Sequence, residues 1–492
     1  MTQICVSLTE ETTARTIDRM VELAPVADLF EIRGDLLLDL DLLTLLRAKT
    51  KPLVFTCRPI REGGRFDGDE ARRRILLLEA AKRGFDWVDV ELRSGFHDVL
   101  LEKAGNGLIV SWHDFAAVPD DLPTLYSRMC DGGADLVKIA VTPRGIADVG
   151  RLVAFAEETS SKGGVPLLAI AMGPLGILTR VLAGRYGAPF TYASTAAGAE
   201  AAPGQIEAGL MADLYRVRDI GPATRVYGVL GTDAARSLSP VLHNRAFEAR
   251  GLPAVYVPLQ AEALEPFLRA LPAMRLSGFS VTRPFKTAIL EHLQEIEEDA
   301  ALCGSVNTVV VRDDGMLRGS TTDGRGVTVP LRRLLDIKAK AVTIVGAGGA
   351  SRAAALALHR KAAKVTVVAR DAGQARSVAA AVGCAWAELP EGLTRHYDVL
   401  INATPLGSHA HPEATPVAAE LLRPGAVVLD MVYDPLETRL LREATAAGCR
   451  TIGGLEMLIG QAVAQFETWT GLEAPHDVMK AAALFLVQAG EA

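Results

Sequence analysis

The chain has 492 residues, 49% of them hydrophobic, and its 59 acidic residues against 52 basic ones leave a net charge of −7. So long a chain exceeds one hydrophobic core, which predicts two or three domains. The negative charge argues against nucleic acid as the main partner. No apolar run approaches the roughly 18 residues that a membrane span needs, so we expect no membrane partner.

The N-terminal stretch carries acids early and lacks the apolar centre of a secretion signal, so we expect a cytoplasmic protein. Six cysteines are scattered and form no C-x-x-C pair, which indicates reduced thiols and predicts no metal site. The one close histidine pair, His409 and His411, is interpreted as part of a solvated loop.

Residues 1–220 form the first expected domain, in which short apolar runs alternate with helical runs. Eight of these runs are predicted to be strands: 4–8, 27–32, 53–57, 87–92, 108–112, 136–140, 166–171 and 190–193. Eight βα units in roughly 220 residues indicate a (β/α)8 barrel, and a doubly wound sheet is the alternative. The active site of a barrel lies where its strands end, so polar residues at these ends are candidates.

A lysine inside an apolar strand is the main candidate of this domain. Lys138 lies in the run 134–140, and burial lowers the pKa of an amine, which can then attack a ketone. A lysine paired with a nearby acid inside the barrel is an equally good interpretation. His113 is a candidate general acid and base, or a histidine satisfied in the core. Arg33, Arg58 and Arg180 would add a positive field that suits a carboxylate substrate.

A set of motifs in residues 1–220 resembles type I 3-dehydroquinate dehydratase. The set comprises Glu31-Ile32-Arg33, Thr56-Cys57-Arg58 with Glu62-Gly63-Gly64, Ser111-Trp112-His113-Asp114-Phe115, Val137-Lys138-Ile139-Ala140, Met172-Gly173 with Arg180, and Ala202-Pro203-Gly204-Gln205. The motifs occur in order along the whole segment and are specific as a set.

This resemblance implies that Lys138 forms a Schiff base with the substrate ketone. It also implies that His113, helped by Glu62, moves protons during the loss of water. The carboxylate and hydroxyls of the substrate would be held by Glu31, Arg33, Arg58, Arg180 and Gln205. In that family serine commonly precedes Ala-Pro-Gly-Gln, and Ala201 stands there in this sequence. We therefore expect a lid that lacks one hydroxyl contact.

The segment 218–224 is predicted to be a linker, and the chain beyond it carries a second set of elements. We expect a substrate-binding domain over 225–335 and a Rossmann domain over 336–452. C-terminal helices over 453–492 are expected to pack back on the substrate-binding domain. Lys286 and Asp323, if brought together, could polarise a carbonyl or hydroxyl and relay its proton.

A strand, a glycine turn and a helix start follow one another at 342–352. Small residues let the backbone approach a pyrophosphate, and free N–H groups of a helix start face it. A second strand at 364–369 completes a βαβ unit, which favours a dinucleotide site over an ordinary tight turn. Arg370 ends that strand and favours the 2′-phosphate of NADP, whereas the adjacent Asp371 weakens this preference.

The second half resembles shikimate dehydrogenase over about 225–490. The matching motifs are Ser-Leu-Ser-Pro from Ser237, Val-Thr-Arg-Pro-Phe-Lys to Lys286, Val-Asn-Thr at Asn307, Thr-Asp-Gly at Asp323, the glycine loop, Asn-Ala-Thr-Pro-Leu-Gly from Asn402, and Gly-Gly-Leu-Glu-Met-Leu from Gly453. The resemblance implies that Lys286 and Asp323 are the catalytic dyad.

The same resemblance implies the binding residues. Shikimate would be bound by Ser237, Ser239, Thr282, Asn307, Thr322, Tyr433 and Gln461. The cofactor NADP(H) would be bound by Gly346, Ala347, Gly348, Gly349, Ala350, Arg370, Thr404 and Gly454.

Taken together, the two resemblances predict a bifunctional enzyme whose substrates are small molecules. It would dehydrate 3-dehydroquinate to 3-dehydroshikimate and reduce that product to shikimate with NADPH. One alternative is a quinate-oriented NAD dehydrogenase in the second half. Another is a non-catalytic sensor or repressor of the quinate pathway, which would be expected to lack the lysine nucleophile or the dyad. The sequence leaves the oligomeric state open.

Overall fold

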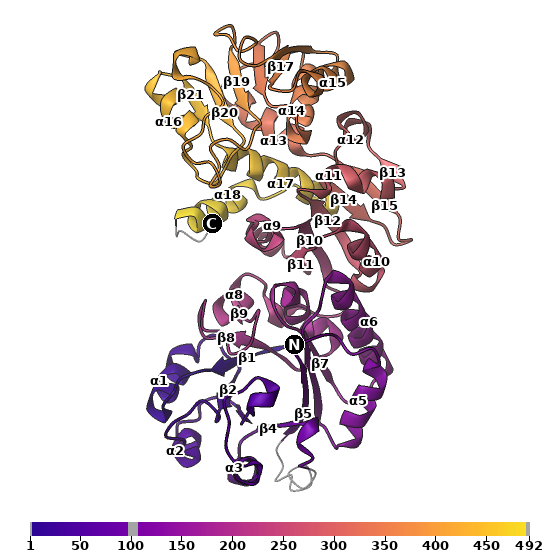
Figure 1. The fold of residues 1–492 in the computed structure, drawn as a ribbon, viewed down its shortest axis with the longest axis vertical. Helices are drawn as coiled ribbons and strands as arrows, with labels where there is room; N and C mark the ends of the chain where they lie inside the picture. The colour runs from indigo at the N-terminus through magenta and orange to yellow at the C-terminus, as the bar shows by residue number, and fades with distance from the viewer. Residues whose placement is uncertain (1, 97–106, 489–492) are drawn as a thin grey trace. The chain divides into compact units, whose positions relative to one another are not determined.

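The computed structural model describes residues 2–96 and 107–488 of the chain. The chain divides into two compact units, one of Met1–Val226 with Pro253–Leu276 and the other of Tyr227–Leu252 with Ser277–Ala492. Each unit is an α/β structure (Figure 1). The boundaries at 335 and 452, predicted to separate the substrate-binding domain, the Rossmann domain and the C-terminal helices, stay predictions, because the division is into two units only.

All eight strands predicted for the first domain form. They are β1 (Gln3–Leu8), β2 (Leu29–Arg33), β3 (Leu53–Thr56), β4 (Trp87–Glu91), β5 (Gly107–Asp114), β6 (Leu136–Val141), β7 (Leu167–Ala171) and β8 (Phe190–Ser194). They lie in one parallel sheet in the order β7-β6-β5-β4-β3-β2-β1-β8, and the short β9 (Ile206–Glu207) follows β8. This is the strand order of a (β/α)8 barrel. The sheet is curled but not closed in the described part of the chain, because no ladder joins β7 to β8.

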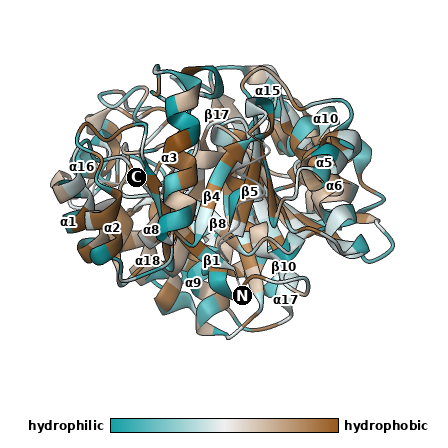
Figure 2. Cartoon of the chain, turned by 90° about the horizontal axis from the view of Figure 1, so that it is seen from below, coloured by the Kyte–Doolittle hydropathy of each residue, from teal (hydrophilic) through white to brown (hydrophobic). Residues whose placement is uncertain are grey.

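Helices alternate with these strands. They are α1 (Thr13–Leu23), α2 (Leu42–Arg47), α3 (Glu70–Arg83), α5 (Leu122–Asp131), α6 (Ile146–Lys162), α7 (Ile177–Val181) and α8 (Ala208–Asp213). Several starts are capped by an oxygen side chain, such as Asp69 at α3 and Asp121 at α5, which satisfies a free backbone N–H. Hydrophobic and hydrophilic residues alternate along α3 in Figure 2, as expected of a helix with one buried face.

The first sheet of the second half is mixed. Its strands are β10 (Arg225–Gly231), β11 (Ala254–Gln260), β12 (Leu276–Val281), β13 (Glu295–Ile296), β14 (Thr308–Val311) and β15 (Leu317–Ser320), in the order β11-β10-β12-β14-β15-β13. Its helices are α9 (Ser239–Ala249), α10 (Leu264–Met274), α11 (Phe285–Ala288), α12 (Glu298–Cys303) and α13 (Asp323–Arg332). Strand β14 pairs antiparallel with β12 on one side and with β15 on the other, which brings Thr308 opposite Ser280 and opposite Ser320.

The second sheet is fully parallel. Its strands are β16 (Ala341–Val345), β17 (Lys364–Ala369), β18 (Ala385–Glu388), β19 (Val399–Asn402), β20 (Val427–Asp430) and β21 (Arg450–Ile452), in the order β18-β17-β16-β19-β20-β21. Helices α14 (Gly349–His359), α15 (Ala372–Val382) and α16 (Arg439–Ala446) connect them. This is the Rossmann order, with the switch point for a dinucleotide between β16 and β19.

Two helices, α17 (Gly454–Thr470) and α18 (His476–Gln488), follow the last strand. The side chains of α17 reach the mixed sheet: Trp469 Nε1 donates to the carbonyl of Val309 at 3.0 Å, and Gln465 Nε2 donates to that of Asn307 at 3.0 Å. In the described part of the chain, no helix is both long and apolar enough to cross a membrane.

Candidate functional site

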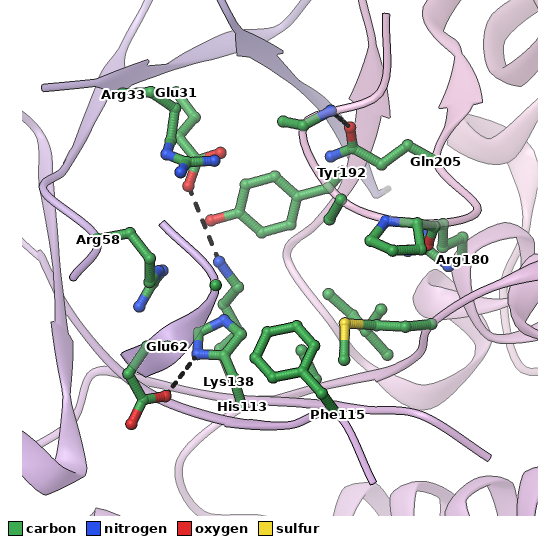
Figure 3. Close-up of a pocket in the computed structure, with 17 residues that line it drawn as sticks. Glu31, Arg33, Arg58, Glu62, His113, Phe115, Lys138, Arg180, Tyr192 and Gln205 are labelled. Carbon is green, nitrogen blue, oxygen red and sulfur yellow. Dashed lines mark hydrogen bonds and ion pairs between the residues drawn. The ribbon is translucent and has the colours of Figure 1, made fainter. Parts of the chain in front are cut away.

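A pocket of about 610 Å³, its open mouth included, is lined by residues from the strands of the first unit and the loops that follow them (Figure 3). All eight site residues predicted for the first domain line it: Glu31, Arg33, Arg58, Glu62, His113, Lys138, Arg180 and Gln205. Each is less than a tenth exposed. The ends of parallel strands therefore bring together residues that lie far apart in the sequence, as the barrel interpretation requires.

Lys138, on β6, lies among acids. Its Nζ donates to Asp89 Oδ2 at 3.0 Å, lies 3.8 Å from Glu31 Oε1, and sits 4.2 Å from the centre of the Tyr192 ring. Lys138 therefore fits both interpretations, the nucleophile and the lysine paired with an acid, because it is buried in an apolar strand and also lies beside acids. The neutral amine needed for attack on a carbonyl forms when the ammonium passes a proton to such a neighbour.

A ladder of alternating charges leads away from this lysine. Arg58 donates to Asp89 Oδ2 at 2.8 Å and to Glu91 Oε1 at 2.7 Å. Arg73, fully buried on α3, donates to the other oxygen of Glu91 at 2.6 Å. Burial alone would raise the pKa of Asp89, but Arg58 and Lys138 hold that pKa well below its ordinary value. Asp89 therefore remains an anion beside the lysine.

The three pocket arginines differ in their partners. Arg33 makes a two-pronged ion pair with Asp35, at 2.9 and 2.7 Å, and Arg58 is held by the two acids above. Within the described chain, Arg180 donates only to the carbonyls of Ala171 and Pro203, at 2.7 and 2.9 Å. Without a nearby carboxylate among the described residues, burial lowers its pKa to about 10. Arg180 is thus the pocket cation that an incoming carboxylate would stabilise most.

His113 and Glu62 share a hydrogen bond, 3.2 Å between Nδ1 and Oε2. Burial, with the charges of Arg58 and Lys138, holds the pKa of His113 well below 6.5. Burial raises the pKa of Glu62, although the nearby Arg93 opposes this. A neutral imidazole bonded to a carboxyl group can take a proton from a bound substrate and return it.

The rim of the pocket is a loop from 201 to 205. Gln205 Oε1 accepts from the backbone N–H of Ala201 at 2.8 Å, and its Nε2 donates to Ser7 Oγ at 3.2 Å. Ser7 Oγ in turn donates to Glu31 at 2.7 Å. Ala201 therefore contributes its backbone to the rim but has no hydroxyl to offer the pocket.

In the second unit, Lys286 and Asp323 form an ion pair of 2.7 Å. Asn307 Nδ2 lies 2.7 Å from Asp323 Oδ1, 3.0 Å from Thr322 Oγ1 and 3.0 Å from Gln461 Oε1. The Lys286 side chain is a quarter exposed while that of Asp323 is 3% exposed. A buried carboxylate thus orients an ammonium whose other face is open to a ligand.

Four other predicted shikimate residues lie outside this cluster. Ser237 Oγ accepts from the backbone N–H of Ser239 at 3.2 Å. Within the described residues, no hydrogen bond joins Ser237, Ser239, Thr282 or Tyr433 to the Lys286 cluster. The structure thus brings Lys286, Asp323, Asn307, Thr322 and Gln461 together but not the other four, and the catalytic and binding roles of all nine stay predictions.

The glycine turn joins β16 to α14. Gly346 has φ +115, and a Cβ there would lie 3.0 Å from the Ala403 carbonyl oxygen. A Cβ on Gly348, which caps α14, would meet nothing within 4 Å. The turn is therefore small, with open space before the N–H groups of a helix, as a pyrophosphate requires. Ala347 completes the turn, and Gly349 and Ala350 are the first two residues of α14.

Arg370 and Asp371 follow β17 directly. Arg370 is exposed and makes no hydrogen bond or ion pair with any described residue. Asp371 caps α15, its Oδ1 accepting from the Gln374 N–H at 3.0 Å. The acid is thus explained by the helix start, and the free guanidinium matches the 2′-phosphate of NADP.

Two further cofactor candidates have structural contacts. Thr404 N–H and Oγ1 both donate to Asn402 Oδ1, which folds the turn after β19. Gly454 lies so close to the segment after β20 that a Cβ would come within 2.5 Å of the Val432 carbonyl carbon. Among the described residues, no cluster of three or more histidine, cysteine or acidic side chains could hold a metal ion.

Comparison with known families assigns the two halves of the chain to different families, and it places residues 253–276, which the structure groups with the first unit, in the second half. Residues 4–222 match type I 3-dehydroquinase. Residues 229–309 match the shikimate dehydrogenase substrate binding domain, 330–412 match shikimate/quinate 5-dehydrogenase, and 454–484 match the shikimate 5′-dehydrogenase C-terminal domain.

A relative from Arabidopsis thaliana, a chloroplastic bifunctional 3-dehydroquinate dehydratase/shikimate dehydrogenase, is 38% identical over 94% of this chain and 82% of its own. The chain belongs to this bifunctional dehydratase/dehydrogenase family. An NADP(+) shikimate dehydrogenase of Thermococcus kodakarensis is 42% identical over 53% of this chain and 96% of its own. A solved shikimate 5-dehydrogenase of Thermus thermophilus, bound to NADP(H) and shikimate, is 36% identical with a TM-score of 0.50, over 53% of this chain and 99% of its own.

Four side chains of this bifunctional protein escaped the sequence analysis: Asp35, Asp89, Glu91 and Tyr192. Asp89 and Glu91 alternate with valines in β4, a spacing that points both acids to one face of the sheet. Acids in an apolar strand are costly unless paired, so the spacing itself was a usable signal. Tyr192 carried none, because tyrosine is common in strands.

Proposed function

We propose that the dehydratase/dehydrogenase carries out two consecutive steps at separate sites. It dehydrates 3-dehydroquinate to 3-dehydroshikimate in the first unit and reduces that product to shikimate with NADPH in the second. The observation that carries the first activity is Lys138, buried on β6 at a pocket that also holds the His113–Glu62 pair and Arg180.

Substrate binding begins with the carboxylate, which we place on Arg180. This arginine is buried and has no acid partner in the described chain, so a carboxylate there gains two charge-assisted hydrogen bonds without displacing another acid. Arg33 and Arg58 are already neutralised by acids. We infer that they orient the acids of the pocket and that Glu31 and Gln205 take the substrate hydroxyls.

Lys138 then attacks the ketone. Its ammonium passes a proton to Glu31, whose Oε1 lies 3.8 Å from Nζ, because the charges around Asp89 hold that acid as an anion. The amine forms a C–N bond while the carbonyl electron pair moves to oxygen, and that oxygen leaves as water. The protonated Schiff base left on Lys138 withdraws electrons from the adjacent carbon, which makes its C–H bond more acidic.

His113 removes that proton. Its ring is neutral because its pKa is well below 6.5, and Glu62 stabilises the imidazolium that forms. The imidazolium then protonates the hydroxyl that departs from the next carbon, so water leaves and a C=C bond forms. Hydrolysis of the Schiff base restores Lys138 and releases 3-dehydroshikimate, for a net loss of one water.

In the second unit, Lys286 supplies the proton for the reduction. A hydride from bound NADPH leaves an alkoxide, and the Lys286 ammonium, oriented by Asp323 at 2.7 Å, protonates it. Asn307 holds the other oxygen of Asp323 at 2.7 Å. The turn from Gly346 to Ala350 fits the pyrophosphate, and we assign the 2′-phosphate to Arg370.

The test of both activities is one reaction. The purified protein, given 3-dehydroquinate and NADPH, should oxidise the cofactor and yield shikimate. Borohydride added with 3-dehydroquinate should add mass to the peptide that contains Lys138, and Lys138→Ala should abolish this adduct while shikimate oxidation continues. Turnover without any borohydride adduct would remove the Schiff base from the mechanism.

The non-catalytic alternative gains no support from these sites. A sensor would be free to lose its nucleophile or its dyad, whereas Lys138 and the pair Lys286–Asp323 are present and bonded. We retain a cytoplasmic location as a proposal, and the Arabidopsis relative is described as chloroplastic.

A further inference from the structure

Tyr192, on β8, lines the dehydratase pocket beside Lys138. Its ring centre is 4.2 Å from the Lys138 Nζ, and the residue is 3% exposed. Figure 3 shows its phenol oxygen pointing to the side of the lysine that faces Glu31. The hydroxyl has no hydrogen-bond partner among the described residues.

Packing does not explain this hydroxyl. The ring meets Phe190 edge-on, with centroids 5.6 Å apart, and supports the lysine ammonium through its face. A phenylalanine would make both contacts equally well. Burying a hydroxyl without a partner is unfavourable. We therefore expect the Tyr192 hydroxyl to form a hydrogen bond with a bound ligand.

The charges around the phenol make it a hydrogen-bond donor. The groups facing it are Glu31, Cys5, Asp89 and Arg58, with Lys138 over its ring. Burial first, and then Glu31, Cys5 and Asp89, raise the pKa of Tyr192 well above 10, although Arg58 opposes this. The phenol therefore keeps its proton and cannot serve as the base that deprotonates Lys138.

We propose that Tyr192 is a further catalytic residue of the dehydratase, and that its hydroxyl donates a hydrogen bond to the substrate carbonyl oxygen while Lys138 attacks. A carbonyl carbon is ready for attack when it lies about 3–3.5 Å from Nζ. Because Nζ lies 4.2 Å from the centre of the Tyr192 ring, the carbonyl oxygen is then close to the phenol. As the C–N bond forms, the carbonyl pair moves to oxygen and the hydrogen bond stabilises the growing negative charge.

That oxygen then takes one proton from the attacking nitrogen and one from the acid that had deprotonated the ammonium, and it leaves as water, so Tyr192 ends the step unchanged. This inference rests on the Schiff-base role proposed for Lys138. It assigns the developing oxyanion to a side chain that otherwise has no polar partner in the described structure, rather than to the pocket arginines, of which two are already paired with acids.

The test compares two single-oxygen deletions, Tyr192→Phe and Tyr186→Phe. Tyr186, on the short helix Ala183–Tyr186, is also buried, and its hydroxyl likewise has no partner within the described residues, but it does not line the pocket. Adduct formation on Lys138 is followed by quenching with borohydride at successive times after 3-dehydroquinate is added. The shikimate dehydrogenase activity of each full-length variant reports on the integrity of the chain.

Removal of one oxyanion donor typically slows a reaction by about 10²-fold or more. Tyr192→Phe should therefore slow adduct formation on that scale, while Tyr186→Phe forms it at the wild-type rate. Both variants should melt no lower than the wild type, because each loses an unpartnered buried oxygen. Adduct formation at the wild-type rate in Tyr192→Phe would overturn the inference, as would equal slowing in both variants. A wild-type protein that turns over without an adduct would instead overturn the Schiff-base role itself.

Discussion

Replacing Arg180 by methionine removes the one pocket cation that lacks an acid partner among the described residues and keeps an unbranched chain of similar length. The substitution tests whether this residue, rather than Arg33 or Arg58, receives the substrate carboxylate. Two backbone carbonyls lose a donor in the variant, so its fold should be checked by thermal melting. The unrelated shikimate dehydrogenase activity of the same chain provides an internal control.

The size of the effect follows from the burial of the guanidinium. Burial lowers the pKa of Arg180 from 12.5 to about 10. At 1.36 kcal/mol per unit, the charged form is disfavoured by about 3 kcal/mol before a carboxylate arrives. A substrate carboxylate that pairs with the guanidinium offsets this cost of about 3 kcal/mol, and a free energy of that size corresponds to roughly 10²-fold in kcat/KM.

Arg180→Met should therefore lower kcat/KM for 3-dehydroquinate by about 10²-fold. The loss is measured from the ultraviolet absorbance of the conjugated product. Arg185→Met is a matched control, because Arg185 donates to one backbone carbonyl and does not line the pocket; its kcat/KM should stay at the wild-type value. A methyl ester of the substrate should be handled equally by Arg180→Met and wild type. A variant that still discriminates strongly between acid and ester would refute the assignment.

Three more outcomes follow from the sites. Lys286→Ala should lower the turnover number for shikimate by about 10²-fold or more with a smaller change in KM; loss of affinity alone would make Lys286 an anchor. Arg370→Ala should raise the KM for NADP far more than that for NAD, and equal effects would contradict its contact with the 2′-phosphate. His113 is neutral in the fold and its pKa is depressed, so the unfolded chain binds its proton first as pH falls below 6.5. Stability should therefore decline on the acid side of 6.5, and in His113→Asn that loss should shrink. Dehydratase kcat/KM should fall only at lower pH, through the depressed pKa of His113 in the folded enzyme.

The architecture of the dehydratase half was largely predictable, because short apolar runs separated by helical ones carry both the strand count and the strand ends. Lys138 and His113 were found in this way, since each interrupts or ends an apolar run. The partners of Lys138 were not, because a buried ion pair joins strands that are far apart in sequence. Asp89 precedes Lys138 by 49 residues, and no local periodicity records that distance.

In the dehydrogenase half, the catalytic pair could be predicted from the sequence, but the role of one acid could not. Its motifs identified Lys286 and Asp323, and the structure joins them at 2.7 Å. The sequence could not separate the two uses of Asp371, because an acid after a strand serves a ribose hydroxyl or a helix start equally well. Only the bond from the Gln374 N–H to Asp371 decides between them.

The ladder of alternating charges from Arg73 through Glu91, Arg58 and Asp89 to Lys138 constrains how the dehydratase can change over generations. Each member is buried, and each acid is shared by two cations. A single neutral replacement removes one charged partner from each of its neighbours in the ladder, so substitutions along the ladder should show strong epistasis. Acceptable variants are then reached by paired exchanges, such as Arg73→Met with Glu91→Gln, that are each harmful alone. The accessible mutational paths are fewer here than at exposed positions of the same barrel.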